Sequence, residues 1–332
     1  MYKTKTLSLL IFLAIIVACN NSEKPHGKIA INIFDAAANQ LIDSNASIEI
    51  LAQGFNWSEG PVWVDDLNTL LFSDVPENKI YKWSEKDSIS VFLDAAGHTS
   101  EGNEKSNNGP NGLLLDYEGD LLICQHGDRR IALLNSGLEN PQHQFISIAD
   151  KYEGKDYNSP NDLTIDSLGN LYFTDPPYGQ PDQKTAEIGV NGVYRVKRNG
   201  EVQRLVDTLF RPNGIGISSD EKTLYINNSD PENSVLYAYT INEEGKLING
   251  KVLFDSNELL KKAEGLPDGL KVHSSGNIFA TGPGGVLIIS PEGKHLATIS
   301  TGRATANCCF DTDENYLYIT ADDVLMRVKL KK

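Results

Sequence analysis

Hydrophobic and polar residues alternate in short runs along most of this chain, and the runs come in pairs joined by turn residues. In one such pair, Leu163 and Ile165 alternate with polar residues, residues 167–170 have turn chemistry, and residues 171–173 are strand formers. This pattern predicts a β-strand, a tight turn and a second β-strand. One polar residue opens the first strand and another closes the second, namely Asn161 and Asp175.

The same pattern occurs six times along the chain. Successive copies begin 52, 50, 52, 55 and 38 residues apart. Short strands repeated at about this period, without helical periodicity, are typical of β-propellers, in which each blade has about four strands. Six copies therefore predict an all-β fold, a six-bladed β-propeller. The copies begin at Glu59, Asn111, Asn161, Asn213, Asp268 and Ala306.

The last copy is shorter than the others because the chain ends soon after Val328. We expect its missing outer strand to come from the N-terminal run at residues 46–51. Such a strand would close the ring and cover an exposed sheet edge. Residues 45–332 are therefore assigned to the propeller domain.

In a propeller, residues at equivalent positions of the copies lie close together around the channel. The innermost strand of each blade lines the central channel, so the first residues of the six copies should form an inner ring at one mouth. The second strand runs antiparallel, so its last residue returns to the same mouth further from the axis. This outer ring comprises Asp74, His126, Asp175 and Asn228. Ala306 provides no ligand, and its neighbour Asn307 is expected to point elsewhere.

The inner ring is rich in oxygen atoms. One Glu, one Asp and several Asn side chains give two formal negative charges, which suits a hard cation and Ca²⁺ in particular. A zinc site would be expected to recruit His or Cys, which the ring lacks. The alternative is structural, because Asn-Gly and Asp-Gly are common turn dipeptides that need no metal. Glu59 and Asn161, which is followed by Asp162, fit the turn interpretation less well, so we favour the metal.

The first residues of the chain read as a targeting segment. Lys3 and Lys5 precede an apolar run at residues 7–18 that is too short to span a bilayer as a helix. The sequence IVAC, residues 16–19, resembles a bacterial lipoprotein signal. A plain secretory signal and an uncleaved anchor are the alternatives. Each of these interpretations predicts export from the cytoplasm.

The lipoprotein interpretation divides this region in two. Residues 1–18 would be the signal peptide, and Cys19 would become the lipidated N-terminus of a tether at residues 19–44. The protein would then be lipid-anchored in the bacterial cell envelope, in the periplasm or at the outer membrane. Its contact with a membrane would be made only through this anchor.

Charge and cysteine content exclude several classes of protein. The formal net charge is −15, and it becomes −17 if Lys3 and Lys5 are removed with the signal. So acidic a domain argues against nucleic acid or an anionic membrane surface as a partner. The remaining cysteines lie in apolar strand patterns without the spacing of a zinc site, so they are expected in the core. They are Cys124, Cys308 and Cys309.

Distinct motifs occur at the strand ends of the repeats: SEGPVW (58–63), CQHGDRR (124–130), NSPND (158–162), FTDPPYG (173–179), RPNG (211–214) and PDG (267–269). Together, and in this order from about Gly54 to the C-terminus, they resemble the gluconolactonase family. This family also contains regucalcin (senescence marker protein) and luciferin-regenerating enzyme. The CQHGDRR segment resembles the bacterial gluconolactonase branch in particular.

The resemblance implies a six-bladed propeller that holds one divalent metal ion in its channel and hydrolyses lactones. The metal would most often be Ca²⁺, with Mg²⁺, Mn²⁺ and Zn²⁺ as possible substitutes. Glu59, Asn213 and Asp268 match the family's metal-binding residues. Asn161 matches a channel asparagine that either reaches the metal or contacts the substrate.

Ordinary metal chemistry then suggests roles in catalysis. A cation can polarise the lactone carbonyl for attack by water. Asp268 is the favoured residue to bind the metal and to orient or deprotonate the water. Because a coordinated carboxylate is a weak base, His126 is the competing candidate, unless it is only a structural residue at a strand end.

Four further residues are candidates for binding substrate hydroxyl groups at the rim: Asn111, Arg129, Arg130 and Tyr178. The alternatives are that the two arginines pair with surface carboxylates and that the tyrosine packs over Pro176 and Pro177. The leading hypothesis is an exported, metal-dependent hydrolase of a small-molecule sugar lactone. A hydrolase of other esters, or a non-catalytic propeller that binds carbohydrate or protein around a structural metal, stays open. Gly-x-Ser-x-Gly and dinucleotide-binding motifs are absent from the sequence.

Overall fold

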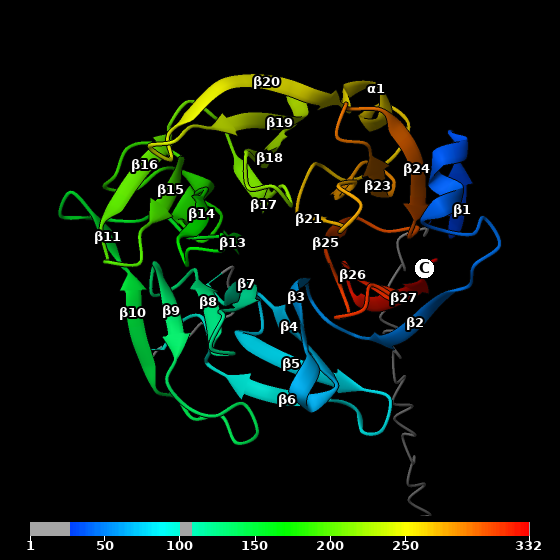
Figure 1. Cartoon of the computed structure of the whole chain (residues 1–332). Coiled ribbons are helices and arrows are strands. Elements are labelled where there is room, and N and C mark those ends of the chain that lie inside the picture. Colours follow the sequence, from blue (N-terminus) through cyan, green and yellow to red (C-terminus); the bar gives the residue numbers. More distant parts are fainter. Residues whose placement is uncertain (1–26, 100–107, 332) are drawn as a thin grey trace, which may run out of the picture.

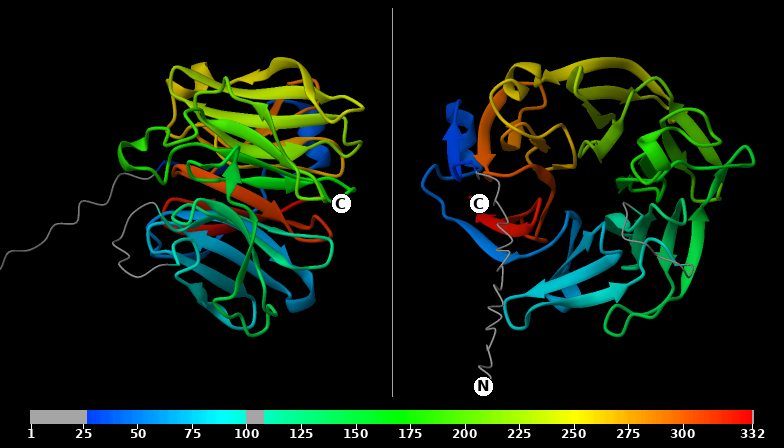
Figure 2. Two further views of the ribbon diagram at one scale, coloured as in Figure 1. Left: turned by 90° about the vertical axis from the view of Figure 1, so that its left-hand side faces the viewer. Right: turned by 180° about the vertical axis from the view of Figure 1, so that it is seen from behind.

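Six small antiparallel sheets surround one central axis in the computed structural model, which describes residues 27–99 and 108–331 (Figure 1). Five of these sheets have four strands and one has five. The fold is a six-bladed β-propeller, as the six repeats predict. Figure 2 shows the same ring from the side and from behind.

In blades 1 to 4 the strands run in chain order from the channel to the rim, and in blades 5 and 6 the outermost strand comes from the N-terminal region. Blade 1 contains β3 (Ser58–Val64), β4 (Thr69–Asp74), β5 (Lys79–Ser84) and β6 (Ser88–Asp94). Blade 2 contains β7 (Pro110–Leu115), β8 (Leu121–Gln125), β9 (Arg130–Leu134) and β10 (Phe145–Ala149). Blade 3 contains β13 (Leu163–Ile165), β14 (Leu171–Asp175), β15 (Gly192–Val196) and β16 (Val202–Val206).

The other half of the ring is built in the same way. Blade 4 contains β17 (Pro212–Ile217), β18 (Thr223–Asp230), β19 (Asn233–Ile241) and β20 (Leu247–Asp255). Blade 5 contains β21 (Leu270–Val272), β22 (Ile278–Gly282), β23 (Gly285–Ile289), β24 (His295–Ser300) and β1 (Ala30–Ile33). Blade 6 contains β25 (Thr305–Phe310), β26 (Tyr316–Ala321), β27 (Val324–Lys329) and β2 (Ile48–Gln53).

The connecting segments add a few short elements. They are the hairpin of β11 (Lys151–Tyr152) and β12 (Lys155–Asp156), the one-turn helix α1 (Asn257–Leu260), and the 3-10 helices η1 (Ala36–Gln40), η2 (Asp65–Leu67) and η3 (Pro181–Gln183). In the described ranges, no helix is long and apolar enough to cross a membrane.

The N-terminal strand closes the ring, as the short last repeat predicts. β2 pairs antiparallel with β27, from Ile48 opposite Val328 to Gln53 opposite Val324. Blade 6 therefore takes three strands from the C-terminus of the chain and its outermost strand from the N-terminal region (Figure 1).

The predicted tether is wrong for residues 30–42, because these residues are part of the propeller. β1 adds to β24 as a fifth strand of blade 5, with Ala30 opposite Ser300. η1 follows, and Ala38 and Ile42 are fully buried against blades 5 and 6. The apolar side chains of this segment cover surface that a tether would leave in water. The predicted signal peptide and Cys19 lie outside the described residues.

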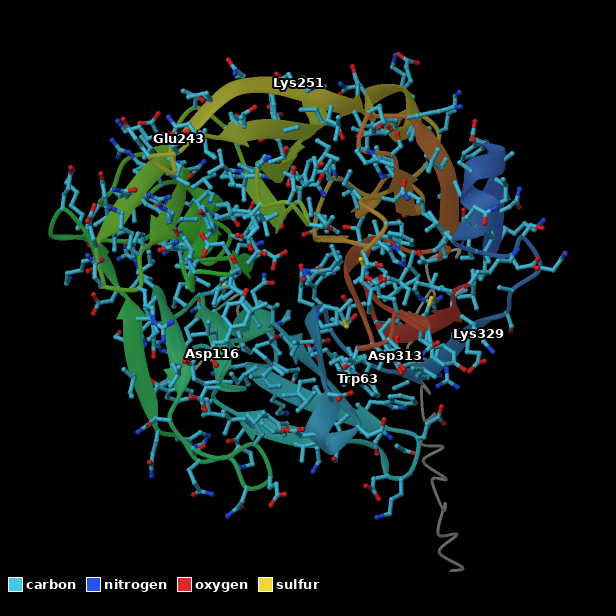
Figure 3. All side chains as sticks on the ribbon, in the orientation of Figure 1. Trp63, Asp116, Glu243, Lys251, Asp313 and Lys329 are labelled. Carbon is cyan, nitrogen blue, oxygen red and sulfur yellow. The ribbon has the colours of Figure 1, made fainter. Side chains whose placement is uncertain are left out.

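The hydrophobic core is divided among the blades. It consists of six clusters of buried side chains, and each cluster fills the interface between two adjacent blades. Cys124, Cys308 and Cys309 are buried free thiols in three different interfaces, so they are core residues as predicted. Charged side chains such as Glu243 and Lys251 lie on the outer edge (Figure 3).

Close backbone contacts between inner strands explain the glycine that follows most inner-ring residues. The Gly112 N–H donates to the Asn161 carbonyl (2.8 Å), and the Gly214 N–H donates to the Asp268 carbonyl (3.0 Å). A Cβ on Gly214 would lie only 2.2 Å from that carbonyl oxygen. These Asn-Gly dipeptides are therefore in strands at blade contacts, and the turn interpretation of them is wrong.

Side chains of the second strands also hold the inner ring in place. In four blades, one such side chain donates to the backbone carbonyl of the inner-ring residue in the next blade. The pairs are Ser73 to Asn111 (2.7 Å), Thr174 to Asn213 (2.7 Å), Asn227 to Asp268 (2.6 Å) and Thr281 to Ala306 (2.9 Å). The backbone of four ring residues is thus fixed by the neighbouring blade.

Candidate active site

A cavity of about 1040 Å³ opens at one mouth of the channel. Five of the six inner-ring residues line it, so the equivalent positions of the repeats do converge. These five are Glu59, Asn111, Asn161, Asn213 and Asp268. Ala306 does not line the cavity.

The three asparagines form a chain of hydrogen bonds around the ring. Asn111 Nδ2 donates to Asn161 Oδ1 (3.0 Å), and Asn161 Nδ2 donates to Asn213 Oδ1 (2.7 Å). Asn213 Nδ2 then donates to the Tyr178 hydroxyl (3.3 Å) and to Ser229 Oγ (3.1 Å). The chain fixes the orientation of each amide. It leaves Asn111 Oδ1 buried, without a hydrogen-bond partner in the described part of the protein.

Two carboxylates complete the ring. Glu59 is 2% exposed, and its Oε2 accepts from the Gly60 N–H (2.9 Å). Asp268 Oδ1 is buried and has no hydrogen-bond partner among the described residues. Burial raises the pKa of Glu59 to about 7. Burial, and next the Glu59 carboxylate, raise the pKa of Asp268 well above its usual range. The ring therefore holds two carboxylates that lack a compensating positive charge.

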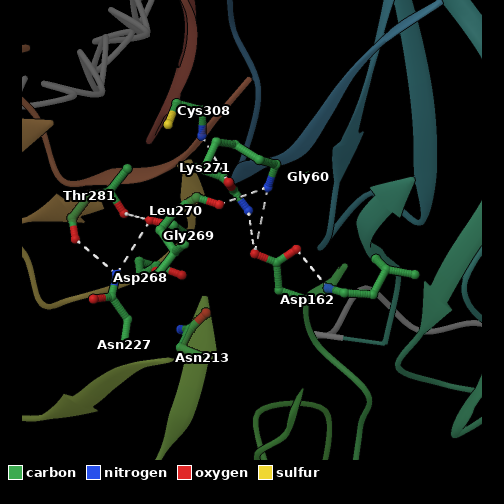
Figure 4. A network of polar contacts seen from close by, with 12 residues as sticks. Gly60, Asp162, Asn213, Asn227, Asp268, Gly269, Leu270, Lys271, Thr281 and Cys308 are labelled. Atoms are coloured by element: carbon green, nitrogen blue, oxygen red, sulfur yellow. Dashed lines mark hydrogen bonds and ion pairs between the residues drawn. The ribbon is translucent and has the colours of Figure 1, made fainter. Parts of the chain in front are cut away.

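An ion pair that the repeat pattern does not predict lies next to the ring, between the buried Asp162 and the half-buried Lys271. Lys271 Nζ lies 3.9 Å from Asp162 Oδ2 and donates to the Leu270 carbonyl (3.1 Å) (Figure 4). Burial disfavours the charge of Lys271, but Asp162 and other neighbouring groups raise its pKa overall. We therefore treat Lys271 and Asp162 as a pair that is neutral overall.

Asn307 links this ion pair to the ring. Its Nδ2 lies 3.3 Å from Asp162 Oδ2 and 3.4 Å from Glu59 Oε2. The expectation that Asn307 points away from the channel is therefore wrong. The register of β25 and β26 shifts between Thr305 and Asn307, and this irregularity breaks the alternation of side chains on which the expectation rested.

One signal in the sequence could have found Asp162 and Asn307. Each follows an inner-ring residue, at the position where the other four blades have glycine. Gly269 leaves the space that the Asn307 side chain occupies. A Cβ on Gly269 would lie only 2.0 Å from that side chain. A departure from the glycine pattern in blades 3 and 6 therefore marks two side chains that meet across the channel.

The outer ring separates into one cavity residue and three structural residues. His126 is 1% exposed and lines the cavity. Asp74, Asp175 and Asn228 instead accept hydrogen bonds from backbone N–H groups of the segments that lead into the inner strands. For Asp175 the donors are Asn158 and Ser159, both at 2.8 Å.

Only some of the predicted substrate-binding residues lie at the cavity. Asn111, Asn161 and Tyr178 line the cavity, but Arg129 and Arg130 do not. Their guanidinium groups bind other parts of the protein, so we withdraw the prediction that they bind substrate. Arg129 Nε donates to the Tyr157 carbonyl (2.5 Å), and its guanidinium also lies near Asp156 and Glu187. Arg130 Nε donates to Gln125 Oε1 (2.6 Å), and its Nη2 pairs with Asp128 (3.1 Å).

The rim of the cavity contains residues that lie outside the repeat positions. Arg211 precedes β17, two positions before the ring residue Asn213. The loop after α1 contributes Lys262 and Glu264, and apolar side chains such as Trp57 cover part of the wall. The cavity therefore has an acidic, amide-rich floor and a mixed rim.

A metal ion at the inner ring would need amide oxygens as ligands in addition to the two carboxylates. Within residues 27–99 and 108–331, no group of three or more His, Cys, Asp or Glu side chains could hold a metal ion. A cation at the ring would therefore take two carboxylates together with amide oxygens. Ca²⁺ accepts such mixed oxygen ligands.

Fold and site together define a six-bladed β-propeller with a carboxylate and amide pocket at its channel mouth. Residues 57–323 match the sequence model described as "SMP-30/Gluconolactonase/LRE-like region". The chain belongs to this family, and the resemblance noted in its motifs is confirmed.

Similarity to named proteins extends over nearly the whole chain. A gluconolactonase of Zymomonas mobilis is 35% identical over 307 residues, which cover 90% of this chain and 85% of the relative. The structure of a gluconolactonase from Xanthomonas campestris superposes with a TM-score of 0.80 at 30% identity, covering 92% and 96% of the two chains. The protein is accordingly an enzyme, a hydrolase that acts on carboxylic ester bonds and resembles gluconolactonases.

A more distant structure shares only the fold. The regucalcin of Agrobacterium tumefaciens, described as a calcium-binding protein, superposes with a TM-score of 0.67 at 17% identity. The alignment covers 86% of this chain and 95% of the regucalcin.

Proposed function

We propose that the protein hydrolyses a sugar lactone with the help of one divalent cation, Ca²⁺ by preference, held by Glu59, Asn161, Asn213 and Asp268. The observation that carries this proposal is the buried Asp268 Oδ1, which has no hydrogen-bond partner among the described residues. A buried carboxylate oxygen in that state is costly unless a positive charge is close to it.

The charges of the channel fit a divalent cation. Lys271 and Asp162 compensate each other, which leaves Glu59 and Asp268 with two formal negative charges. Asn161 and Asn213 add neutral oxygens that each have a second lone pair. The donor set contains only oxygen, which suits Ca²⁺ and, less specifically, Mg²⁺ or Mn²⁺. The calcium-binding regucalcin with the same fold supports this assignment.

The chain's own residues then have distinct roles in hydrolysis. A bound cation would polarise the lactone carbonyl and make a bound water more acidic. Asp268 is the favoured base, because its Oδ1 is available to accept a proton from the attacking water. His126 is the second candidate. Asn111 and Tyr178 face the same cavity and would bind hydroxyl groups of the sugar.

Hydrolysis of D-glucono-1,5-lactone tests this proposal. Acid release by the purified full-length protein would be followed in a pH-stat and corrected for spontaneous ring opening. We expect activity that EDTA removes and Ca²⁺ restores. A folded, calcium-treated protein that hydrolyses neither this lactone nor a panel of other lactones would contradict the proposal. It would favour a hydrolase of other esters.

We also propose that the protein is exported and anchored in the bacterial cell envelope by a lipid on Cys19. The support is the IVAC sequence at residues 16–19, after a short apolar run. Metabolic labelling with a palmitate analogue should tag the wild-type protein and should not tag Cys19→Ala. Equal labelling of both proteins would contradict the anchor.

A further inference from the structure

Arg211 is held in the cavity wall in a defined position. Its backbone N–H donates to Asn228 Oδ1 (3.1 Å), and its carbonyl accepts from the Ser229 N–H (2.9 Å). The guanidinium carbon lies 5.7 Å from the centre of the Tyr178 ring and 5.3 Å from that of the Phe210 ring. Tyr178 in turn accepts a hydrogen bond from the ring residue Asn213. The aromatic contacts orient the guanidinium beside the proposed metal ligands.

The side-chain donors of Arg211 are not used within residues 27–99 and 108–331. Its side chain makes no ion pair or hydrogen bond with any described residue, although it is half-buried. All the other arginines have such a partner: Arg129, Arg130, Arg195, Arg198, Arg204, Arg303 and Arg327. A partly desolvated guanidinium without an acceptor is costly, so its retention in a cavity wall points to an external acceptor.

Neighbouring charges do not neutralise Arg211. Lys261 pairs with Glu258, and Lys262 and Glu264 bring opposite charges to the same loop. The guanidinium therefore carries an uncompensated positive charge at the rim, in a chain whose net charge is −15. Such a group attracts an anion locally, although the protein as a whole repels one.

We propose that Arg211 binds an anionic substituent of the substrate, so that the enzyme prefers sugar lactones carrying a carboxylate or a phosphate in addition to the lactone ester. The planar donors of arginine match both groups. The substituent takes no part in the bond changes. Water adds to the lactone carbonyl, the ring C–O bond breaks, and the hydroxy acid forms with the anionic group intact. This inference rests on the proposed lactonase function.

Three lactones separate the possible anions. D-glucono-1,5-lactone is neutral, D-glucaro-1,4-lactone carries a carboxylate, and 6-phospho-D-glucono-1,5-lactone carries a phosphate. We expect wild-type kcat/KM to be at least about tenfold higher for one of the two acidic lactones, which then identifies the anion. Arg211→Gln should abolish most of this preference, mainly through KM, and Arg211→Lys should recover part of it.

Arg198→Gln is the matched control, because it removes the same charge from an exposed side chain that does not line the cavity. This variant should keep the wild-type preference. If wild type hydrolyses the neutral lactone at least as well as both acidic ones, or if Arg211→Gln keeps the preference, the inference is wrong.

Direct binding separates failure of this inference from failure of the lactonase proposal. Calorimetry on the calcium-treated protein would compare gluconate with glucarate and 6-phosphogluconate, and it needs no turnover. Wild type should bind one of the two more highly charged acids more tightly than gluconate, and Arg211→Gln should bind all three alike. Equal affinities for wild type would overturn the role of Arg211, whatever the catalytic activity.

Discussion

The carboxylates in and around the channel differ in how far their surroundings compensate their charge. Asp162 has Lys271 at 3.9 Å, and Asp175 accepts two backbone N–H groups. Glu59 and Asp268 have no cationic residue within ion-pair distance among the described residues, which makes them the acidic pair that a divalent cation would complete.

The raised pKa of Glu59 predicts a specific pH dependence of stability for the metal-free protein. Its pKa is about 7 in the folded state and lies near 4.5 without the fold. Because the folded state binds the extra proton, stability should be full below about pH 4.5 and should fall as the pH rises through about 7. The loss should be at most about 3 kcal/mol, and Asp268 acts in the same direction.

Thermal unfolding in EDTA between pH 4.5 and 8 measures this effect. Glu59→Gln cannot ionise, so its unfolding temperature should depend less steeply on pH than that of wild type. Parallel profiles for the two proteins would show that Glu59 is not the titrating group.

Single substitutions can decide whether Asp268 or His126 acts as the base. If Asp268 takes the proton from water, Asp268→Asn should lower kcat about 10²- to 10⁴-fold, whereas His126→Gln should change it less than about tenfold. Initial rates at saturating calcium provide both values. A large fall in kcat for His126→Gln, with calcium affinity unchanged, would assign the base to His126 instead.

At the level of strands, several blade contacts share one feature: a glycine of an inner strand packs against the backbone of the neighbouring inner strand. Gly214→Ala would place a Cβ 2.2 Å from the Asp268 carbonyl oxygen. The strands must then separate, so we expect a loss of more than about 2 kcal/mol in the free energy of unfolding and weaker calcium binding.

Gly137→Ala is the matched control, because nothing lies within 4 Å of the Cβ it would add. Urea unfolding should give a change within about 0.5 kcal/mol for this variant. Similar stabilities for the two glycine variants would mean that the close contact between the blades can relax at little cost.

The sequence predicts the strands and the inner ring well because both depend on a regular repeat. Glu59, Asn111, Asn161, Asn213 and Asp268 meet in one cavity for that reason. Irregular features are not predictable in this way. The register shift before Asn307 reverses an expectation based on alternation, and Arg129, in a turn with φ of 57°, reaches Tyr157 rather than the cavity. Such turns depend on tertiary contacts that a single repeat does not encode.

At the level of the whole molecule, the ring is completed by segments distant in sequence. β2 closes blade 6, and β1 and η1 cover the outer side of blades 5 and 6. The region first interpreted as a tether is thus part of the folded domain. Its periodicity is too short to be recognised alone, since β1 has only four residues.

The N-terminal segment should therefore contribute to global stability. Ile42 is fully buried, so Ile42→Ala should lower the free energy of unfolding by about 2–5 kcal/mol. Leu168→Ala, at a position that is 72% exposed, should have little effect. Chemical denaturation of the two variants gives the comparison, and a wild-type stability for Ile42→Ala would mean that the segment detaches without cost.

Hydrolysis is proposed to depend on one divalent cation held by the inner ring. Calorimetric titration of the EDTA-treated, dialysed protein with Ca²⁺ tests it most directly, with Glu59→Gln, Asp268→Asn and the structural carboxylate variant Asp175→Asn in parallel. We predict one site in wild type and in Asp175→Asn, and a loss of affinity of at least about tenfold in both ring variants. Unchanged calcium binding in Glu59→Gln and Asp268→Asn, or no binding by folded wild type, would show that the inner ring is not a calcium site.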